Sequence, residues 1–110
     1  MGFSSAICYR NELGKILSKL RVEYSETMKM QAERLGYSSN YISMVSTDRR
    51  PLSAEFYKSV MEHYGKQAQE YKDDLLNILF DKDIIARFHE LVPEGTLDQL
   101  LYLVYGVKND

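Results

Sequence analysis

The chain has 110 residues, of which 45% are hydrophobic and 27% are charged, and its formal net charge is −2. This length allows one compact unit or a small domain with an extension. The composition excludes an intrinsically disordered chain, which would have fewer hydrophobic residues and a higher net charge. The single cysteine, Cys8, excludes an internal disulfide bond and a cysteine-based metal site, and His63 and His89 have no partners at metal-ligand spacing.

No stretch of the sequence predicts a membrane segment or a targeting signal. No apolar run approaches the roughly eighteen residues of a membrane span, and residues 1–10 lack the basic and apolar regions of a secretory signal. Ala6 stands where an N-myristoylation motif requires Ser or Thr. We therefore expect a cytoplasmic protein in a reducing compartment, with no membrane partner, no cofactor and no metal.

Residues 1–10 have no helical period and predict an N-terminal arm. After them, apolar residues recur every three or four positions, which is typical of an amphipathic helix with Asn11 as its cap. These residues are Leu13, Ile16, Leu17, Leu20 and Tyr24.

The stretch Met28–Val45 predicts a helix, a tight turn and a second helix. Gly36 ends the first helix and supplies the left-handed backbone that such a turn needs, and Ser38 caps the second, about Ser39–Ser46. In a helix-turn-helix, the first helix lies across the DNA backbone and the second presents its N-terminal residues to base edges in the major groove. The alternative is a pair of small core helices with no nucleic acid partner.

The remainder of the chain predicts further helices, so the expected fold class is all-α. Each helix is marked by a capping residue at its start or by Gly or Pro at its end. They are Ala54–Tyr64 after Ser53 and before Gly65, about Lys66–Phe80, Ile84–Val92 before Pro93, and a last helix that begins with a capping box from Thr96 to Gln99 and ends at Gly106.

The last predicted helix is apolar around much of its circumference and must be buried. Either it packs on the helix over Lys66–Phe80 within one subunit, or it forms an interface with a partner. The residues expected at a dimer or partner interface are Leu97, Leu100, Leu101, Val104 and Tyr105.

Charge is divided unevenly along the chain. Residues 1–65 contain nine Lys and Arg against seven Asp and Glu, whereas residues 66–110 contain five against nine. The mildly basic half holds the helix-turn-helix, as a DNA-binding surface requires, and the acidic half should face away from phosphate.

Three short motifs in this order resemble those of the Cro/phage-repressor (XRE) helix-turn-helix family. They are Gly14-x-x-Leu17-x-x-Leu20-Arg21, Ala32-x-x-Leu35-Gly36-Tyr37-Ser38 and Asn40-Tyr41-Ile42-Ser43-x-Val45. The resemblance covers residues 11–65. It implies a compact lambda-repressor-like domain, usually dimeric, that represses transcription at inverted-repeat operators, often in phages and mobile elements.

The chain departs from the family pattern at four positions. Gln31 replaces an apolar residue before the motif alanine, and Met28 replaces a glutamine that typically contacts phosphate. Ser46 and Asp48 stand where Glu and Gly are common. Asp tolerates the left-handed backbone, so we expect the loop after the recognition helix to be kept.

Within the recognition helix, Ile42 and Val45 point inward by spacing, which leaves the polar face for DNA. Asn40 is the expected base reader, because its amide can pair with both N6 and N7 of adenine. Five neighbours complete the predicted contacts at this helix, with the serines serving bases or phosphates and the methionine touching a thymine methyl: Ser38, Ser39, Ser43, Met44 and Thr47. The alternative for Asn40 and the serines is a short solvated face.

Three cations near the motif predict contacts to phosphate. Arg49 and Arg50 directly follow the recognition helix, and Lys29 lies near the start of the preceding one. As exposed charges, the two arginines could equally serve solubility alone. Tyr41 has two interpretations, a phosphate contact through its hydroxyl group or packing in the core.

The sequence therefore predicts an N-terminal arm over residues 1–10, a DNA-binding domain over 11–65 and a helical extension over 66–110. The first hypothesis is a dimeric, autoregulatory transcriptional repressor that binds double-stranded DNA and dimerises through the extension. The second is a protein-binding module, such as an antitoxin or an inhibitor of a host protein, that keeps the motif for autoregulation. We do not expect an enzyme, because no nucleophile and base pair, phosphate loop or metal cluster is present.

Overall fold

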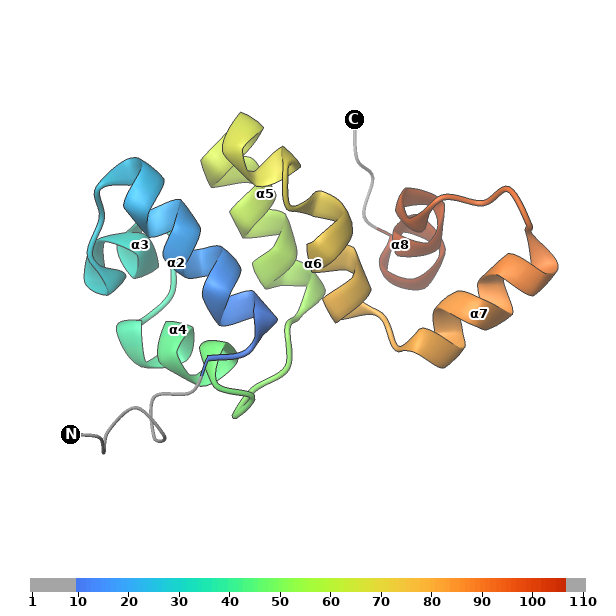
Figure 1. Cartoon of the computed structure of the whole chain (residues 1–110), viewed down its shortest axis with the longest axis horizontal. Coiled ribbons are helices and arrows are strands. Elements are labelled where there is room, and N and C mark those ends of the chain that lie inside the picture. The colour runs from blue at the N-terminus through green and yellow to red at the C-terminus, as the bar shows by residue number, and fades with distance from the viewer. Residues whose placement is uncertain (1–9, 107–110) are drawn as a thin grey trace.

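The computed structural model describes residues 10–106, and every regular element in that range is an α-helix. The seven helices of this range are α2 (Glu12–Tyr24), α3 (Met28–Leu35), α4 (Ser39–Ser46), α5 (Ala54–Gln69), α6 (Lys72–Leu79), α7 (Lys82–Leu91) and α8 (Leu97–Tyr105) (Figure 1). The predicted all-α class is confirmed. The predicted arm lies outside the described residues except for its last position.

Most of these helices begin at a polar side chain that caps the first turn. A side-chain oxygen accepts a hydrogen bond from a backbone N–H that has no partner inside its helix. The capping residues are Asn11, Thr27, Ser38, Ser53, Asp81 and Thr96. Gln99 completes the predicted capping box, because its side chain accepts from the backbone of Thr96. The Asp81 cap explains why α7 begins at Lys82 and not at the predicted Ile84.

Helices α2 to α5 enclose the first part of the core. Seven side chains from α2, α4 and α5 have no exposed surface, and burial of each contributes about 1.5–3 kcal/mol: Leu17, Leu20, Ile42, Val45, Phe56, Tyr57 and Val60. At Gly14, α2 passes directly against the end of α4, where a Cβ atom would lie 2.8 Å from the carbonyl oxygen of Ser46. The absence of a side chain at Gly14 therefore sets how closely α4 can be held.

The region after Tyr64 differs from its prediction. α5 extends to Gln69, but the non-helical backbone of Gly65 (φ 51°, ψ −122°) divides it into two helical segments at the predicted helix end. The single helix predicted over Lys66–Phe80 is instead interrupted at Tyr71, whose backbone (φ −106°, ψ 6°) is not helical. The interruption changes the chain direction, so that apolar residues on both sides of it reach the same core: Ala68, Leu75 and Leu76.

The extension is attached to the first bundle through α6. α8 packs on α6, with Leu100 and Leu101 in the same hydrophobic cluster as the residues of α2 to α5. Lys72 and Asp98 form an ion pair of 2.6 Å between these two helices. α7 lies at the far end of a molecule measuring 49 × 28 × 20 Å (Figure 1). Within residues 10–106, no helix combines the length and apolarity needed to cross a membrane.

Only some of the residues predicted at an interface on α8 are exposed. Leu100 and Leu101 are 5% and 0% exposed, because both belong to the hydrophobic core of their own subunit. They are therefore placed in the core and not on the surface where a partner would be met, and Leu97 is half-buried against the same cluster. Val104 and Tyr105 are exposed, and so are two neighbours that the prediction left out, Tyr102 and Leu103.

Candidate nucleic-acid interface

The predicted helix-turn-helix is present as α3, a left-handed turn and α4. Gly36 has φ 83°, and its N–H donates to the carbonyl oxygen of Ala32 at 2.9 Å. The Ser38 hydroxyl then accepts from the N–H of Tyr41 at 3.0 Å, which caps α4 at its start. The predicted inward residues of both helices are buried: Ala32, Leu35, Ile42 and Val45.

Gln31, a departure from the family pattern, is fully buried, and both polar atoms of its amide form hydrogen bonds. Its Nε2 donates to the carbonyl oxygen of Leu17 at 3.0 Å, and its Oε1 accepts from Nη1 of Arg21 at 2.7 Å. A buried amide without such partners would cost about 1–3 kcal/mol. Because both partners are on α2, the amide fixes the position of α3 on α2.

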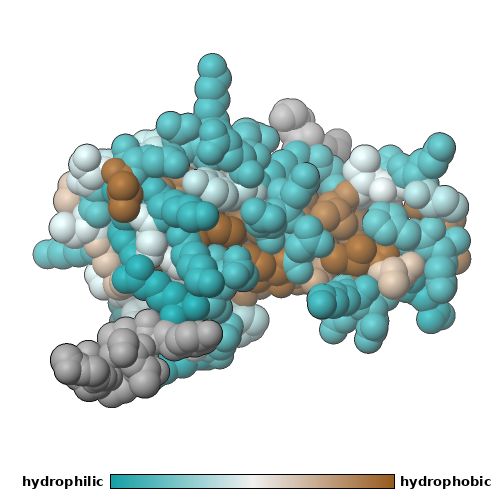
Figure 2. Space-filling view, viewed as in Figure 1, coloured by the Kyte–Doolittle hydropathy of each residue, from teal (hydrophilic) through white to brown (hydrophobic). Residues whose placement is uncertain are grey.

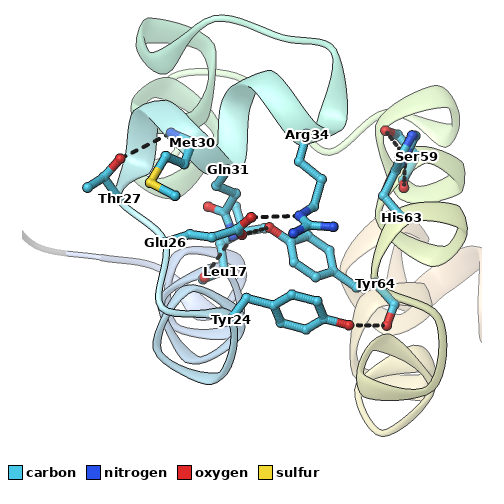
Figure 3. Close-up of polar contacts among 10 residues, drawn as sticks. All are labelled: Leu17, Tyr24, Glu26, Thr27, Met30, Gln31, Arg34, Ser59, His63 and Tyr64. Atoms are coloured by element: carbon cyan, nitrogen blue, oxygen red, sulfur yellow. Dashed lines mark hydrogen bonds and ion pairs between the residues drawn. The ribbon is translucent and has the colours of Figure 1, made fainter.

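A second polar cluster fastens the turn between α2 and α3 to α5 (Figure 3). The Glu26 side chain is 5% exposed and accepts from Nε of Arg34 at 2.6 Å and from the hydroxyl of Tyr64 at 2.7 Å. The Arg34 guanidinium lies 4.8 Å and 5.3 Å from the ring centres of Tyr24 and Tyr64. Burial, with the hydrogen bond to Glu26, raises the pKa of Tyr64 far above its usual range. The phenol therefore stays a neutral donor.

The exposed side of α4 carries the predicted base-reading residues. Ser39, Asn40 and Ser43 are exposed, and Met44 and Thr47 are half-buried. The Thr47 hydroxyl donates to the carbonyl oxygen of Ser43 at 2.9 Å, so it helps to close the helix. The first turns of α4 thus present a polar surface on a helix whose other face is locked in the core.

Tyr41 packs in the way that the second interpretation of this residue proposes. Its ring stacks on Tyr37 with centroids 4.6 Å apart and lies 5.3 Å from Phe56 of α5. The guanidinium of Arg50 lies 5.9 Å from the same ring. Tyr41 therefore anchors α4 to the core, and its ring contacts Arg50, one of the predicted phosphate contacts.

The loop after α4 is held by backbone and side-chain bonds. Asp48 has φ 63°, the left-handed conformation expected of it. The N–H groups of Arg49 and Arg50 both donate to the carbonyl oxygen of Met44, at 2.9 Å and 3.2 Å. Both arginine side chains are exposed, and so is that of Lys29 on α3. These three predicted cations are accessible to phosphate.

Two further arginines, missed in the sequence, lie together on α2 and beside its start. Arg10 and Arg21 both donate to the hydroxyl oxygen of Ser18, the latter at 3.0 Å from Nη2. Burial, and after it the charge of Arg10, lowers the pKa of Arg21. They border a hollow of about 420 Å³ that extends to Thr27 at the start of α3. Eleven residues make three helical turns, and that spacing is the signal that would have revealed the pair.

The comparisons add no relative to this description. No family model, no curated protein and no solved structure matches the chain. Among the residues that the structure describes, no group of three His, Cys, Asp or Glu side chains could hold a metal ion. The interpretation of the site therefore depends on its geometry and chemistry.

Proposed function

We propose that this protein is a sequence-specific DNA-binding regulator of transcription that places the start of α4 in the major groove. The observation that carries the proposal is the exposed polar edge of Ser39, Asn40 and Ser43 on a helix whose opposite face is buried. A helix held in this way can present side chains to base edges without losing core contacts. The amide of Asn40 supplies the paired donor and acceptor that adenine requires.

The positive groups around α4 support the same proposal. Arg49 and Arg50 follow the helix, and the Arg10 and Arg21 pair lies beside the start of α3. Guanidinium groups pair well with phosphate oxygens, and such contacts fix the register of a protein on the duplex. The acidic residues of 66–110 lie mainly on α6, α7 and α8, away from this surface.

A repressor of this kind acts as a homodimer at an inverted repeat, since two-fold symmetry in the protein matches two-fold symmetry in the site. Autoregulation at the promoter of its own gene is the simplest arrangement for a small regulator. The resemblance of residues 11–65 to phage repressors supports repression over activation.

The proposal is tested by selecting duplexes from a random pool with the full-length protein, then measuring affinity by fluorescence anisotropy as the salt concentration rises. A consensus sequence is expected, with an affinity that falls linearly on a logarithmic salt scale. Lys66→Ala is a suitable control, since this exposed cation on α5 follows the bend at Gly65. A pool that shows no enrichment would overturn the proposal.

One observation favours the second candidate, a protein-binding module. Nine large hydrophobic side chains are exposed within residues 10–106, and seven of them lie between Ile84 and Tyr105. Exposed apolar surface gathered on α7 and α8 is typical of an interaction site. This candidate would be favoured if the random pool yielded no enriched DNA sequence and if substitutions on this surface abolished binding of a protein partner.

A further inference from the structure

α7 is the helix that the core covers least. Of its residues only Phe88 is buried, whereas Ile84 is 47% exposed and Leu91 is 77% exposed. Because these two residues are seven apart, they lie along one side of the helix. Together with Phe88 and Leu100, they line a shallow groove of about 420 Å³ between α7 and α8. Figure 2 shows hydrophobic surface over the region of α6 to α8.

The charges around this apolar stripe balance one another. α7 carries Lys82, Asp83, Arg87 and Glu90, two of each sign. Within the part of the chain that the structure describes, none of the four forms an ion pair. A partner of strong net charge would gain nothing from such a helix. A second copy carries the same balanced set, so Arg87 of one copy can lie beside Glu90 of the other.

We propose that a second copy of this chain covers the stripe, with the two α7 helices antiparallel about a two-fold axis. Ile84 of each copy then packs on Leu91 of the other. In that register Arg87 of one copy and Glu90 of the other are offset by about two residues, roughly 3 Å along the axis, which their side chains can span. The Leu91 side chain of each copy enters the groove between α7 and α8 of the other copy.

This pairing rests on the proposed function, in which two copies bind DNA together, and α7 is the surface that joins them. α7 and α4 lie at opposite ends of the long axis of the molecule (Figure 1). Pairing through α7 therefore leaves both α4 surfaces uncovered. The interface itself does not depend on DNA, so it is tested without DNA.

Sedimentation velocity of the full-length protein over the micromolar range measures the dimer directly. We expect a concentration-dependent dimer that Leu91→Glu converts to a monomer. Val22→Glu is the matched control, because Val22 is 79% exposed on α2 and Leu91 is 77% exposed. The control protein should remain dimeric.

The charges test the register independently of the apolar contact. Arg87→Glu and Glu90→Arg should each weaken the dimer by about tenfold, which corresponds to about 1.4 kcal/mol. The double variant should restore it, since each pair is reformed with its signs exchanged. Both positions are exposed, so the fold is kept.

A wild-type protein that stays monomeric, a Leu91→Glu variant that stays dimeric, or a double variant that is not rescued would each overturn this inference. A wild-type protein that stays monomeric would also contradict the homodimer of the proposed function, but none of these results bears on DNA recognition by α4. A monomer that binds a single half-site with sequence preference would overturn the α7 interface and leave DNA recognition standing.

Discussion

Asn11 and Asp48 are joined by a hydrogen bond of 2.6 Å from Nδ2 to Oδ1, although 37 residues separate them in the chain. Nδ2 of Asn11 also donates to the carbonyl oxygen of Val45 at 2.9 Å, and its backbone N–H donates to that of Ser46 at 3.0 Å. The residue that caps α2 therefore also fixes the end of α4 and the loop behind it. The orientation of the proposed reading helix depends on this link.

Replacement of Asn11 should separate its two roles. Asn11→Ala loses the cap and the links to α4, so the free energy of unfolding should fall by about 2 kcal/mol. Asn11→Ser keeps a capping oxygen but loses the Nδ2 donor, and it should recover about half of that loss. Urea unfolding measures both. Equal stability of the serine and alanine variants would mean that the links to α4 alone matter.

Gly14→Ala tests the close approach of α2 to α4. Alanine favours a helix over glycine by about 1 kcal/mol, but its Cβ would meet the Ser46 carbonyl oxygen at 2.8 Å. We expect a net destabilisation of about 1–3 kcal/mol from overpacking, measured by urea unfolding. Lys15→Ala, at the exposed neighbouring position, should change stability by less than about 0.5 kcal/mol. A stabilised Gly14→Ala protein would contradict the described packing.

Tyr64 should account for part of the loss of folding stability at alkaline pH. Burial raises its pKa in the folded protein above the value of about 10 expected in the unfolded chain. Below about pH 10, the contribution of Tyr64 to stability is therefore complete. It is lost as the pH rises from about 10 toward the higher pKa of the folded protein, because in that range only the unfolded chain releases the proton. Tyr64→Phe should show a shallower decline of unfolding free energy above about pH 10, measured by urea unfolding across a pH series. Parallel curves for the two proteins would contradict it.

The cations predict how salt affects binding. Arg50→Ala and Arg10→Ala should each reduce the slope of affinity against salt by about one unit and weaken all DNA sequences alike. Lys66→Ala should leave the slope unchanged. A slope that is insensitive to Arg10 would remove the Arg10 and Arg21 pair from the set of phosphate contacts, while the Arg50 result would test the loop after α4 separately.

Structural features that depend on residues close together in the sequence could be predicted from it. Asn11, Ser38 and Thr96 cap helices through groups three residues away, and Gly36 turns the chain through its own backbone. Apolar spacing likewise indicated that α8 must be buried, which holds for Leu100 and Leu101 but not for residues 102–105, which are exposed. It could not say against what, because apolarity specifies burial and not the partner. That is why the buried Leu100 was expected at an interface.

The polar contacts that orient the site could not be predicted, because their partners are distant in the chain. Gln31 appeared as a departure from the family pattern, yet it bonds residues ten and fourteen positions earlier. Glu26 depends on Tyr64, which is 38 residues away. Such pairs form only after α2, α3 and α5 have packed, and no local pattern records them.

The central claim is that the exposed start of α4 reads base sequence, and Asn40 tests it most directly. The measurement is the affinity of wild-type protein, Asn40→Ala and the exposed control Asn77→Ala for the selected site and for random duplex. We predict that Asn40→Ala loses about 1–3 kcal/mol on the selected site only, and that Asn77→Ala loses nothing on either. Equal loss on both duplexes, or no loss on the selected site, would contradict the account.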